Sequence, residues 1–371
     1  MIANLILGIL CLILILAIPN KNRGLLVSFS LITLFWCLRY DWGNDYMPYL
    51  MEFQDYSNTS VSLSDIDAMK DMRRNSEFGW VWLNMLFGKV LHAGFFGFVI
   101  ALSVFENWTI YRFIKKHVDE NHYWLAVALY VFSTSIFATG ASMFRQYLCI
   151  ICFLWVYEWM LEKKWLPSVA LIFLCSTVHA SNIFILLFLP IFFIRFPDTK
   201  VNLVWVIVII LFFILWLNYA PRFFSSNIGL ILSEYDTLSA YSDYLAERNS
   251  SGEIGLGVIF QYVVLTYTII LLPKFDKPSQ TMALLFIASY LLRPLAATAP
   301  MISRFSMYLT IFVIALWPAF LKFGSNKLVA KGLLVCLFII MTKSFFDFFN
   351  APVWVEKFYE YHTIFSAGSW M

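Results

Sequence analysis

The sequence predicts an all-α, polytopic integral membrane protein with about 12 transmembrane helices, and three observations support this fold class. Of the 371 residues, 61% are hydrophobic and only 13% are charged, whereas soluble domains have roughly 45–50% apolar and about 25% charged residues. Many apolar runs approach the roughly 20 residues that a helix needs to cross a hydrocarbon core of about 30 Å. The alternating ten-residue pattern of a membrane β-barrel is absent, so we expect the spans to be helices.

Long apolar runs define the expected spans. They lie near residues 2–18, 24–38, 93–112, 123–140, 143–161, 166–180, 182–195, 201–218, 256–273, 279–297, 302–321 and 328–345. The first run lacks a basic n-region and an evident A-x-A cleavage site, so we interpret it as a retained helix and not as a signal peptide. The aromatic stretch 78–92 is short and carries Lys89 and His92. We expect a re-entrant or interfacial helix there.

The charges between the runs predict the orientation. Cytoplasmic loops of membrane proteins carry an excess of Lys and Arg. With twelve crossings, the six basic linkers fall on one side, which we expect to be the cytoplasm; they hold Lys21 and Arg23, Arg112, Lys115 and Lys116, Lys163 and Lys164, Arg195 and Lys200, Lys274 and Lys277, and Lys322, Lys327 and Lys331. The N-terminus, the acidic loops 39–92 and 219–255, and the tail 346–371 then lie on the opposite, extracytoplasmic side. We expect residues 1–371 to form a single transmembrane domain.

The two long outer loops differ in character. Residues 62–80 have the pattern of an amphipathic surface helix, with Ser64 as the expected N-cap and acidic residues in the first turn. The loop 219–255 mixes tyrosines with acidic residues. We expect this loop to form a lid over the outer face.

Several function classes lack support in the sequence. The formal charge of +3 is too small to indicate nucleic-acid binding, and the six cysteines lie in apolar spans, which argues against a disulfide framework. Cys149 and Cys152 have CxxC spacing but no second ligand pair, so we expect no zinc site. Walker, dinucleotide-binding and HExxH motifs are absent, so no nucleotide or cofactor site is predicted.

Charged residues near the ends of spans are the candidate site. A charged side chain in a bilayer costs a few kcal/mol, so such residues usually face a cavity. In the predicted topology, seven of them map to the outer face: Arg39, Asp41, Asp45, Arg145, His179, Arg293 and Arg304. Such a pocket would suit an anionic ligand, and the planar fork of arginine favours phosphate. Snorkelling arginines, a packing histidine and aspartates that cap a helix are the simpler alternatives.

Four stretches together resemble one family. RYDWGNDYMPYLMEF (39–53) resembles the R-x-x-x-G-x-D-x-x-x-Y segment of EpsG-type, Wzy-like exopolysaccharide polymerases, which serve O-antigen and capsule synthesis. EFGWVWLNMLF (77–87) resembles their E-P-x-Y-x-x-L-N-x-L stretch, although Phe78 and Gly79 replace the usual order. SMFRQYLCIICFLW (142–155) and FLCSTVHASNIFILLFLP (173–190) resemble their R-Q helix and H-x-S helix pair. The ending YEYHTIF (359–365) is weakly similar to their tyrosine-rich C-terminus.

The resemblance implies a function. Such proteins elongate bacterial surface polysaccharides at the outer face of the plasma (inner) membrane by joining oligosaccharide repeat units carried on a polyprenyl diphosphate. They consume no nucleotide sugar, which fits the missing nucleotide motifs. The resemblance also implies a GT-C-like architecture, membrane lipid as surroundings, and a flippase and a chain-length regulator as partners.

Residue roles follow from that chemistry as hypotheses. Arg145 is the first choice to bind the leaving diphosphate, with Arg304 or Arg39 as a second clamp and Arg293 as a weaker candidate. His179 is the favoured general base because histidine ordinarily titrates near neutrality; Asp45 is the second candidate. Asp41 would orient sugars or Arg39, and Tyr46, Tyr49 and Gln146 would contact sugars. A metal is not required if arginines neutralise the diphosphate, although Asp41 and Asp45 could ligate one.

Three other functions remain open from the sequence. A lipid-linked glycosyltransferase or O-antigen ligase-like enzyme would share the diphosphate clamp and differ only in its acceptor. A membrane acyltransferase would use His179 but leave the arginines without a role. A polysaccharide transporter predicts related halves, and no inverted repeat is visible.

Overall fold

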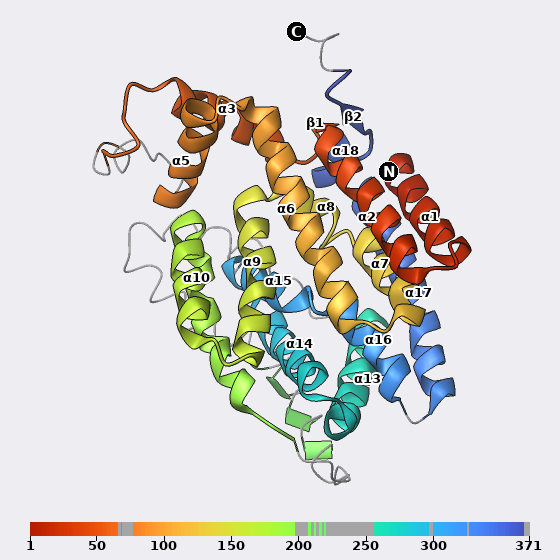
Figure 1. Ribbon diagram of the computed structural model, residues 1–371. Coiled ribbons are helices and arrows are strands. Elements are labelled where there is room, and N and C mark those ends of the chain that lie inside the picture. The colour runs from red at the N-terminus through yellow and green to blue at the C-terminus, as the bar shows by residue number, and fades with distance from the viewer. Residues whose placement is uncertain are drawn as a thin grey trace. The chain divides into compact units, whose positions relative to one another are not determined.

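The computed structural model describes residues 1–65, 68, 77–196, 207–208, 211–212, 215–216, 219, 256–296, 300–324 and 326–366. The described chain is mainly helical, as the sequence predicts (Figure 1). It divides into two compact units, one of residues Met1–Leu187 with Phe338–Met371 and one of residues Phe188–Leu337. The single domain expected over 1–371 stays a prediction.

The first unit contains most of the expected N-terminal spans as helices. These are α1 (Ile2–Ala17), α2 (Lys21–Leu38), α6 (Gly94–His117), α7 (Tyr123–Phe132), α8 (Ala138–Ser142), α9 (Phe144–Leu161) and α10 (Trp165–Val178). Helix α2 packs against α1 and α6, and α9 packs against α6 and α10. The side chain of Asn20 accepts the Arg23 N–H and caps α2, which explains why this helix begins before the apolar run.

One expected helix is broken. The run 123–140 forms α7 and α8 with a turn of residues 133–137 between them, because hydroxyl side chains there bind nearby oxygen atoms. Thr139 Oγ1 donates to the Thr134 carbonyl, and the hydroxyls of Ser133 and Ser135 lie 3.2 Å apart. Such local hydrogen bonds compete with helix formation, which hydrophobicity alone does not reveal.

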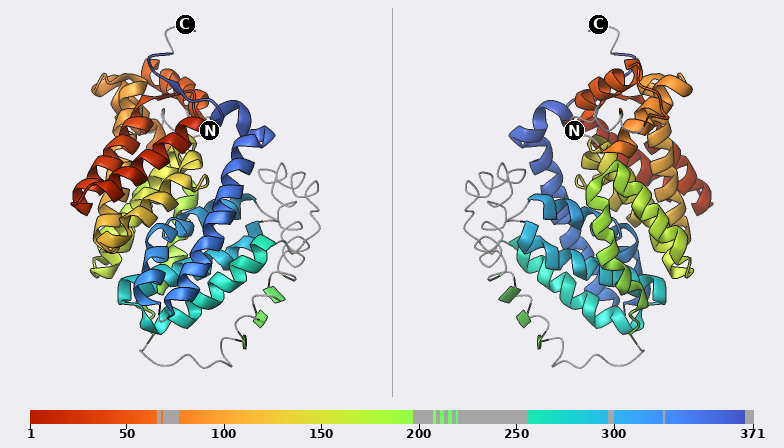
Figure 2. Two further views of the ribbon diagram at one scale, coloured as in Figure 1. Left: turned by 90° about the vertical axis from the view of Figure 1, so that its right-hand side faces the viewer. Right: turned by 90° about the vertical axis from the view of Figure 1, so that its left-hand side faces the viewer.

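Shorter elements gather at one end of the first unit. They are α3 (Tyr46–Asn58), α5 (Phe78–Met85) with a π-helical turn (Leu86–Val90), α18 (Pro352–Phe358), and strands β1 (Arg39–Tyr40) and β2 (His362–Thr363). The strands pair antiparallel, Arg39 opposite Thr363 and Tyr40 opposite His362. The Met1 amino group donates to the carbonyls of Phe358 and Tyr359, so the N-terminus lies beside the C-terminal segment (Figure 2). Three segments predicted on the outer side of the membrane therefore lie together.

A charged cluster around Glu158 lies at the other end of this unit. Glu158, in the last turns of α9, accepts hydrogen bonds of 2.9 Å from Arg112 and Lys116, and Lys116 also reaches Glu162. Arg112 stacks on Trp155, with 3.5 Å between Cζ and the ring centroid. One basic linker of the predicted cytoplasmic side, with Arg112 and Lys116, thus contacts a buried carboxylate.

The second unit is built around α14. Its elements include α13 (Leu256–Leu271), the 3₁₀ turn η4 (Leu272–Lys274), α14 (Lys277–Ala296), α15 (Pro300–Thr310) and α16 (Val313–Phe323), and α14 packs against α15 and α16. The 3₁₀ helix η3 (Ala180–Phe193) and α17 (Lys327–Asn350) run from one unit to the other. Most of the expected span 201–218 lies outside the described residues. The same holds for most of the lid loop 219–255 and of the helix 62–80.

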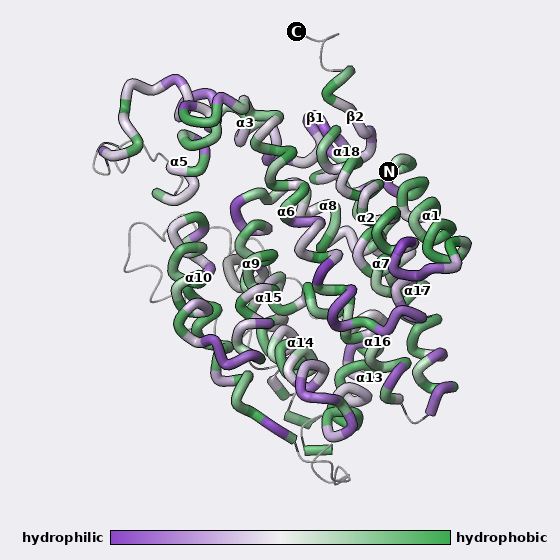
Figure 3. The backbone as a smooth tube through the Cα atoms, in the orientation of Figure 1, coloured by the Kyte–Doolittle hydropathy of each residue, from purple (hydrophilic) through white to green (hydrophobic). Residues whose placement is uncertain are grey.

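The described helices fit a membrane protein. Three helical stretches of the described residues are long and apolar enough to cross a bilayer: α6 (Gly94–His117), Arg304–Phe323, which includes α16 and most of α15, and α17 (Lys327–Asn350). Ile2–Ala17, Trp165–Val178, Ala180–Phe193 and Ile259–Lys274 are apolar but shorter. Hydrophobic residues dominate the helices, and many hydrophilic residues lie at the turns between them (Figure 3). The all-α membrane class is supported, while the count of about 12 spans stays a prediction.

Candidate functional site

Three helix ends of the first unit meet at the carboxylate of Glu77, which immediately precedes α5. Its Oε2 lies 3.0 Å from Nη1 of Arg145, in the first turn of α9. Its Oε1 accepts the backbone N–H of Ala180 at 2.9 Å and lies 3.6 Å from Nδ1 of His179, the residue that ends α10. One carboxylate therefore brings together an arginine and a histidine that are 34 positions apart in the sequence.

The backbone explains why these groups converge. α10 ends at Val178, and His179 is extended, with φ −149° and ψ 109°. The chain then turns into η3, so the Ala180 N–H is one of the donors that the start of a helix cannot satisfy itself. A carboxylate is stabilised at such a position by the N–H group and by the partial positive charge of the helix end. Glu77 supplies that carboxylate from the start of α5.

Helix α3 supports the cluster from one side. The ring of Tyr49 stacks on Phe144 at 4.8 Å and meets Trp80 edge-on at 5.2 Å between centroids. Cζ of Arg145 lies 5.7 Å from the Tyr49 ring centroid. Burial raises the pKa of Tyr49, and the neighbouring Arg145 charge opposes that rise. The phenol is therefore a neutral hydrogen-bonding group in the cluster.

A second acidic side chain fixes α5 to α3. Glu52 Oε2 accepts a hydrogen bond of 2.9 Å from the indole N–H of Trp80. Glu52 and Glu77 both interact electrostatically with Arg145. The side chains of Arg145, Glu77 and His179 are 19%, 25% and 12% exposed, so the cluster is half-enclosed.

Arg39 occupies a different environment. Its side chain is buried, with 1% exposed, and Nη1 donates to Ser103 Oγ at 2.8 Å and to the Trp36 carbonyl. The guanidinium also lies 5.1 and 5.0 Å from the ring centroids of Trp36 and Phe144. These contacts hold α2, α6 and α9 together.

The two aspartates of the opening segment have local partners. Asp41, in the left-handed region with φ 44°, forms a 2.8 Å ion pair with Lys357 of α18. Asp45 precedes α3, and its backbone N–H donates to Ser142 Oγ at 3.2 Å. Both residues lie at the same end of the unit as Glu77, next to the C-terminal segment and α8 respectively.

The predicted sugar-binding residues are mostly enclosed. Tyr46 is fully buried and donates to the Arg39 carbonyl at 3.1 Å, while Gln146 is 2% exposed and Tyr49 is 7% exposed. Arg304 is exposed on α15 of the second unit. Arg293 falls in α14, but its side chain lies outside what the structure describes. The structure thus brings Arg145, His179 and Tyr49 together and leaves the roles of the predicted residues as predictions.

Sequence reasoning missed Glu77, Glu52 and the Ala180 N–H. Glu77 opens the motif EFGWVWLNMLF, so the motif contained a signal for it, but its partners are distant in the sequence. A backbone N–H has no signature in sequence. Across the described ranges, no group of three or more His, Cys, Asp or Glu side chains is arranged to hold a metal ion.

Comparisons with known proteins give one match. The model of a family described as the EpsG family matches residues 22–363. Searches of curated proteins and of solved structures gave no match. The matched range contains Glu77, Arg145 and His179.

Proposed function

The chain belongs to the EpsG family, a membership that supports a general role in exopolysaccharide polymerisation at a membrane, and from this premise we propose a specific reaction. The protein transfers an oligosaccharide from a polyprenyl diphosphate donor to a sugar hydroxyl of an acceptor repeat unit. Transfer takes place at the outer face of the bacterial plasma membrane. The observation that carries this proposal is the meeting of Arg145, Glu77 and His179 at one half-enclosed cluster.

The leaving group sets the first requirement. When the bond between the anomeric carbon and the diphosphate oxygen breaks, its electron pair stays on the diphosphate, so negative charge grows there. A preorganised cation at that point lowers the barrier. Arg145 provides it: Glu77 contacts Nη1, one nitrogen of a guanidinium with five N–H donors, and the Tyr49 ring supports the group. The fork is therefore held in one orientation for phosphate oxygens.

The acceptor hydroxyl sets the second requirement. Its oxygen forms the new bond to the anomeric carbon, and its proton passes to a base. His179 takes this proton in our proposal and becomes an imidazolium. Glu77 Oε1, 3.6 Å from Nδ1, is too far for a hydrogen bond but close enough to stabilise the new positive charge.

The other candidates take supporting roles. Asp45 stays the second candidate for the base, and Arg304 and Arg293 stay candidates for a second clamp. Tyr49 is the best placed of the proposed sugar contacts because it adjoins Arg145. Arg39, Tyr46 and Gln146 are buried among helices, so we assign them to the support of the cluster.

The test is an assay of purified protein with synthetic lipid-diphosphate repeat units, with and without a chelator. We expect a ladder of products in both conditions. Arg145→Lys keeps the charge but loses the fork, and we expect about 10²–10³-fold slower elongation, the cost of removing one preorganised donor. For His179→Ala we expect a loss of about 10²–10⁴-fold.

Arg112→Lys is the matched control, because Arg112 is also an arginine paired with a glutamate, at the other end of the unit. It should elongate as the wild type does. Wild-type chain lengths from Arg145→Lys would remove Arg145 from the site, and normal polymer from His179→Ala would place the base elsewhere. A single transfer in place of a ladder would indicate a ligase-like glycosyltransferase.

A further inference from the structure

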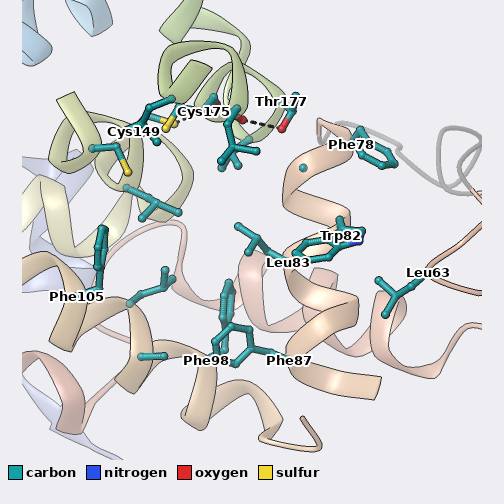
Figure 4. A pocket seen from close by; sticks show the side chains of 18 of the residues that line it. Leu63, Phe78, Trp82, Leu83, Phe87, Phe98, Phe105, Cys149, Cys175 and Thr177 are labelled. Atoms are coloured by element: carbon teal, nitrogen blue, oxygen red, sulfur yellow. Dashed lines mark hydrogen bonds between the residues drawn. The ribbon is translucent and has the colours of Figure 1, made fainter. Parts of the chain in front are cut away.

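A large apolar cavity lies among α5, α6, α9 and α10 of the first unit (Figure 4). Its volume is about 670 Å³, which falls within the roughly 300–1,000 Å³ of pockets that hold drug-sized ligands. Hydrocarbon and aromatic side chains form most of its wall, among them Trp82, Leu83, Phe98, Phe105, Leu148 and Leu174. The reaction proposed above uses none of these residues.

The cavity begins where the charged cluster ends. Phe78 and Gly79, which follow Glu77, line it, and so do Thr177 and Val178, which precede His179. Leu148 lies one helical turn beyond Arg145 on α9. The same three helices thus carry polar groups at one level and an apolar wall directly beside it, which matches a ligand with an anionic head and a hydrocarbon tail.

Part of the wall faces outward. Trp82 is 39% exposed and Leu174 is 64% exposed, although both are large apolar side chains. Large exposed apolar side chains that lie together mark surfaces where a protein meets a membrane or a partner. A wall of this kind suits a lipid chain that enters the cavity from the bilayer.

We propose that this cavity binds the isoprenoid chain of the donor, with the units nearest the diphosphate inside it and the diphosphate at Arg145. The assignment of a diphosphate to Arg145 rests on the proposed function. One cavity beside one arginine suits a phosphorylated single-chain lipid better than a bilayer phospholipid, which has two chains to place. The aromatic rings of Phe98 and Phe105 suit a branched chain with methyl groups along its length.

The first test measures binding to the full-length protein in detergent. The probe is farnesyl phosphate, compared with dodecyl phosphate, which has the same head on a straight chain, and with inorganic diphosphate. Ala101→Trp on α6 fills the cavity, whereas Ile100→Trp adds the same ring to the neighbouring residue, which is 40% exposed and lies outside the lining.

We expect Ala101→Trp to weaken farnesyl phosphate binding at least tenfold, because the indole ring displaces part of the isoprenoid chain from the cavity and the burial energy of those carbon atoms is lost. Ile100→Trp should leave the affinity unchanged. Thermal unfolding of both variants checks that they are folded. Wild-type affinity in a folded Ala101→Trp variant would overturn the proposal. So would tight binding of dodecyl phosphate with the same dependence on Ala101, which would indicate a general site for bilayer lipid.

Native thiols give a second readout, which does not depend on a variant. Cys149, Cys152 and Cys175 line the cavity, and Cys336, exposed on α17, lies outside it. Bound farnesyl phosphate should reduce alkylation of Cys152, the cavity thiol that is partly exposed, by a membrane-permeant maleimide at least tenfold and leave Cys336 unaffected. Unchanged alkylation of Cys152 at saturating probe would contradict the inference.

The two proposals fail separately. If farnesyl phosphate binds as expected but lipid-diphosphate repeat units give no polymer, the cavity assignment stands and the proposed reaction fails. If polymer forms normally in Ala101→Trp, the reaction stands and the cavity is not the site of the chain.

Discussion

At the residue scale, the position of a charge decides its role. Arg39 directly follows the expected span 24–38, and Arg145 lies early in the expected span 143–161; the sequence predicts Arg145 as the first choice for the diphosphate and Arg39 as a second clamp. In the structure, Arg145 is 19% exposed and faces Glu77, while Arg39 is buried between Trp36 and Phe144 and bonded to Ser103. Arg145 is partly exposed, so a ligand can replace Glu77 as its partner, whereas the buried Arg39 is suited to holding helices together.

Arg39→Met should therefore destabilise the protein. The substitution removes two charge-assisted hydrogen bonds, to the Trp36 carbonyl and to Ser103 Oγ, and leaves these buried acceptors without their donor. Leaving a buried acceptor unsatisfied costs about 1–3 kcal/mol. We expect a lower unfolding temperature in detergent and a smaller yield of folded protein, with near-normal elongation per folded molecule.

The comparison variant is Lys343→Met, whose ion pair with Asp347 is largely exposed and should contribute little. If Arg39→Met unfolds as the wild type does but makes no polymer, Arg39 belongs to the diphosphate site after all.

The candidate site could be predicted from the sequence only in part. Arg145 and His179 could be identified because a charged or polar side chain in an apolar run has a high free-energy cost in a membrane and usually faces a cavity or a partner. Glu77 did not stand out, because a glutamate in a polar loop is ordinary. Its importance comes from contacts with residues 68 and 103 positions away, which no local pattern encodes.

At the element scale, the contact between α5 and α10 sets the geometry of the site. A Cβ at Gly79 would lie 2.2 Å from Thr177 Oγ1, 2.8 Å from the Thr177 carbonyl carbon and 2.9 Å from its oxygen. The two backbones can approach this closely only because position 79 has no side chain. Any side chain there must move α5, and Glu77 with it, away from His179.

Gly79→Ala should consequently impair the site. Overpacking of this kind costs about 1–3 kcal/mol, and we expect a lower unfolding temperature together with at least tenfold slower elongation, since positioning errors of this size are costly in catalysis. Gly332→Ala on α17 is the matched control, because no atom lies within 4 Å of the added methyl group. Wild-type elongation by Gly79→Ala would mean that the spacing of α5 and α10 does not control the reaction.

The pairing of β1 with β2 supports a second prediction, which concerns the register of the two strands. Cysteines at directly opposite positions of an antiparallel pair are close enough for a disulfide, so Tyr40→Cys with His362→Cys should cross-link on oxidation. Mass spectrometry of the digested protein would detect the joined peptides.

The control pair is Tyr40→Cys with Thr363→Cys, because a shift by one residue turns the side chain to the other face. Cross-linking of this pair in place of the first would show that the register differs.

The helices themselves were largely predictable, and their interruptions were not. Most described runs form helices within a few residues of the expected bounds, because long apolar segments can satisfy their backbone only as helices in a membrane. The runs 123–140 and 302–321 each contain a break, after Phe132 and after Thr310. Hydrophobicity is the same on both sides of such breaks, so it gives no warning of them.

At the scale of the whole molecule, the first unit has a charged cluster at each end. Asp41, Glu52 and Glu77 lie among the elements near β1 and α5, while Arg112 and Lys116 lie with Glu158 at the far end of α9. The basic linker with Arg112 and Lys116 is thus at the opposite end from the loop 39–92, as the predicted topology requires. The side of the membrane that each end faces stays a prediction.

Labelling of intact cells tests the orientation. Glu360→Cys and Lys164→Cys place thiols at the two ends, where the native side chains are 75% and 57% exposed. A membrane-impermeant maleimide should label position 360 in intact cells and position 164 only after permeabilisation. Labelling in the reverse order would invert the topology and move the proposed reaction to the cytoplasmic face.

The β1–β2 pair also imposes an order on biosynthesis. Residues 39 and 40 are synthesised more than 300 residues before their partners at 362 and 363. The Met1 amino group likewise finds its acceptors only when residues 358 and 359 arrive. Contacts this distant in the chain form late because the intervening loop must close first. A polypeptide that lacks residues 358–363 would keep its helices in the membrane but lose the contacts that hold Met1 and β1 at this end of the first unit.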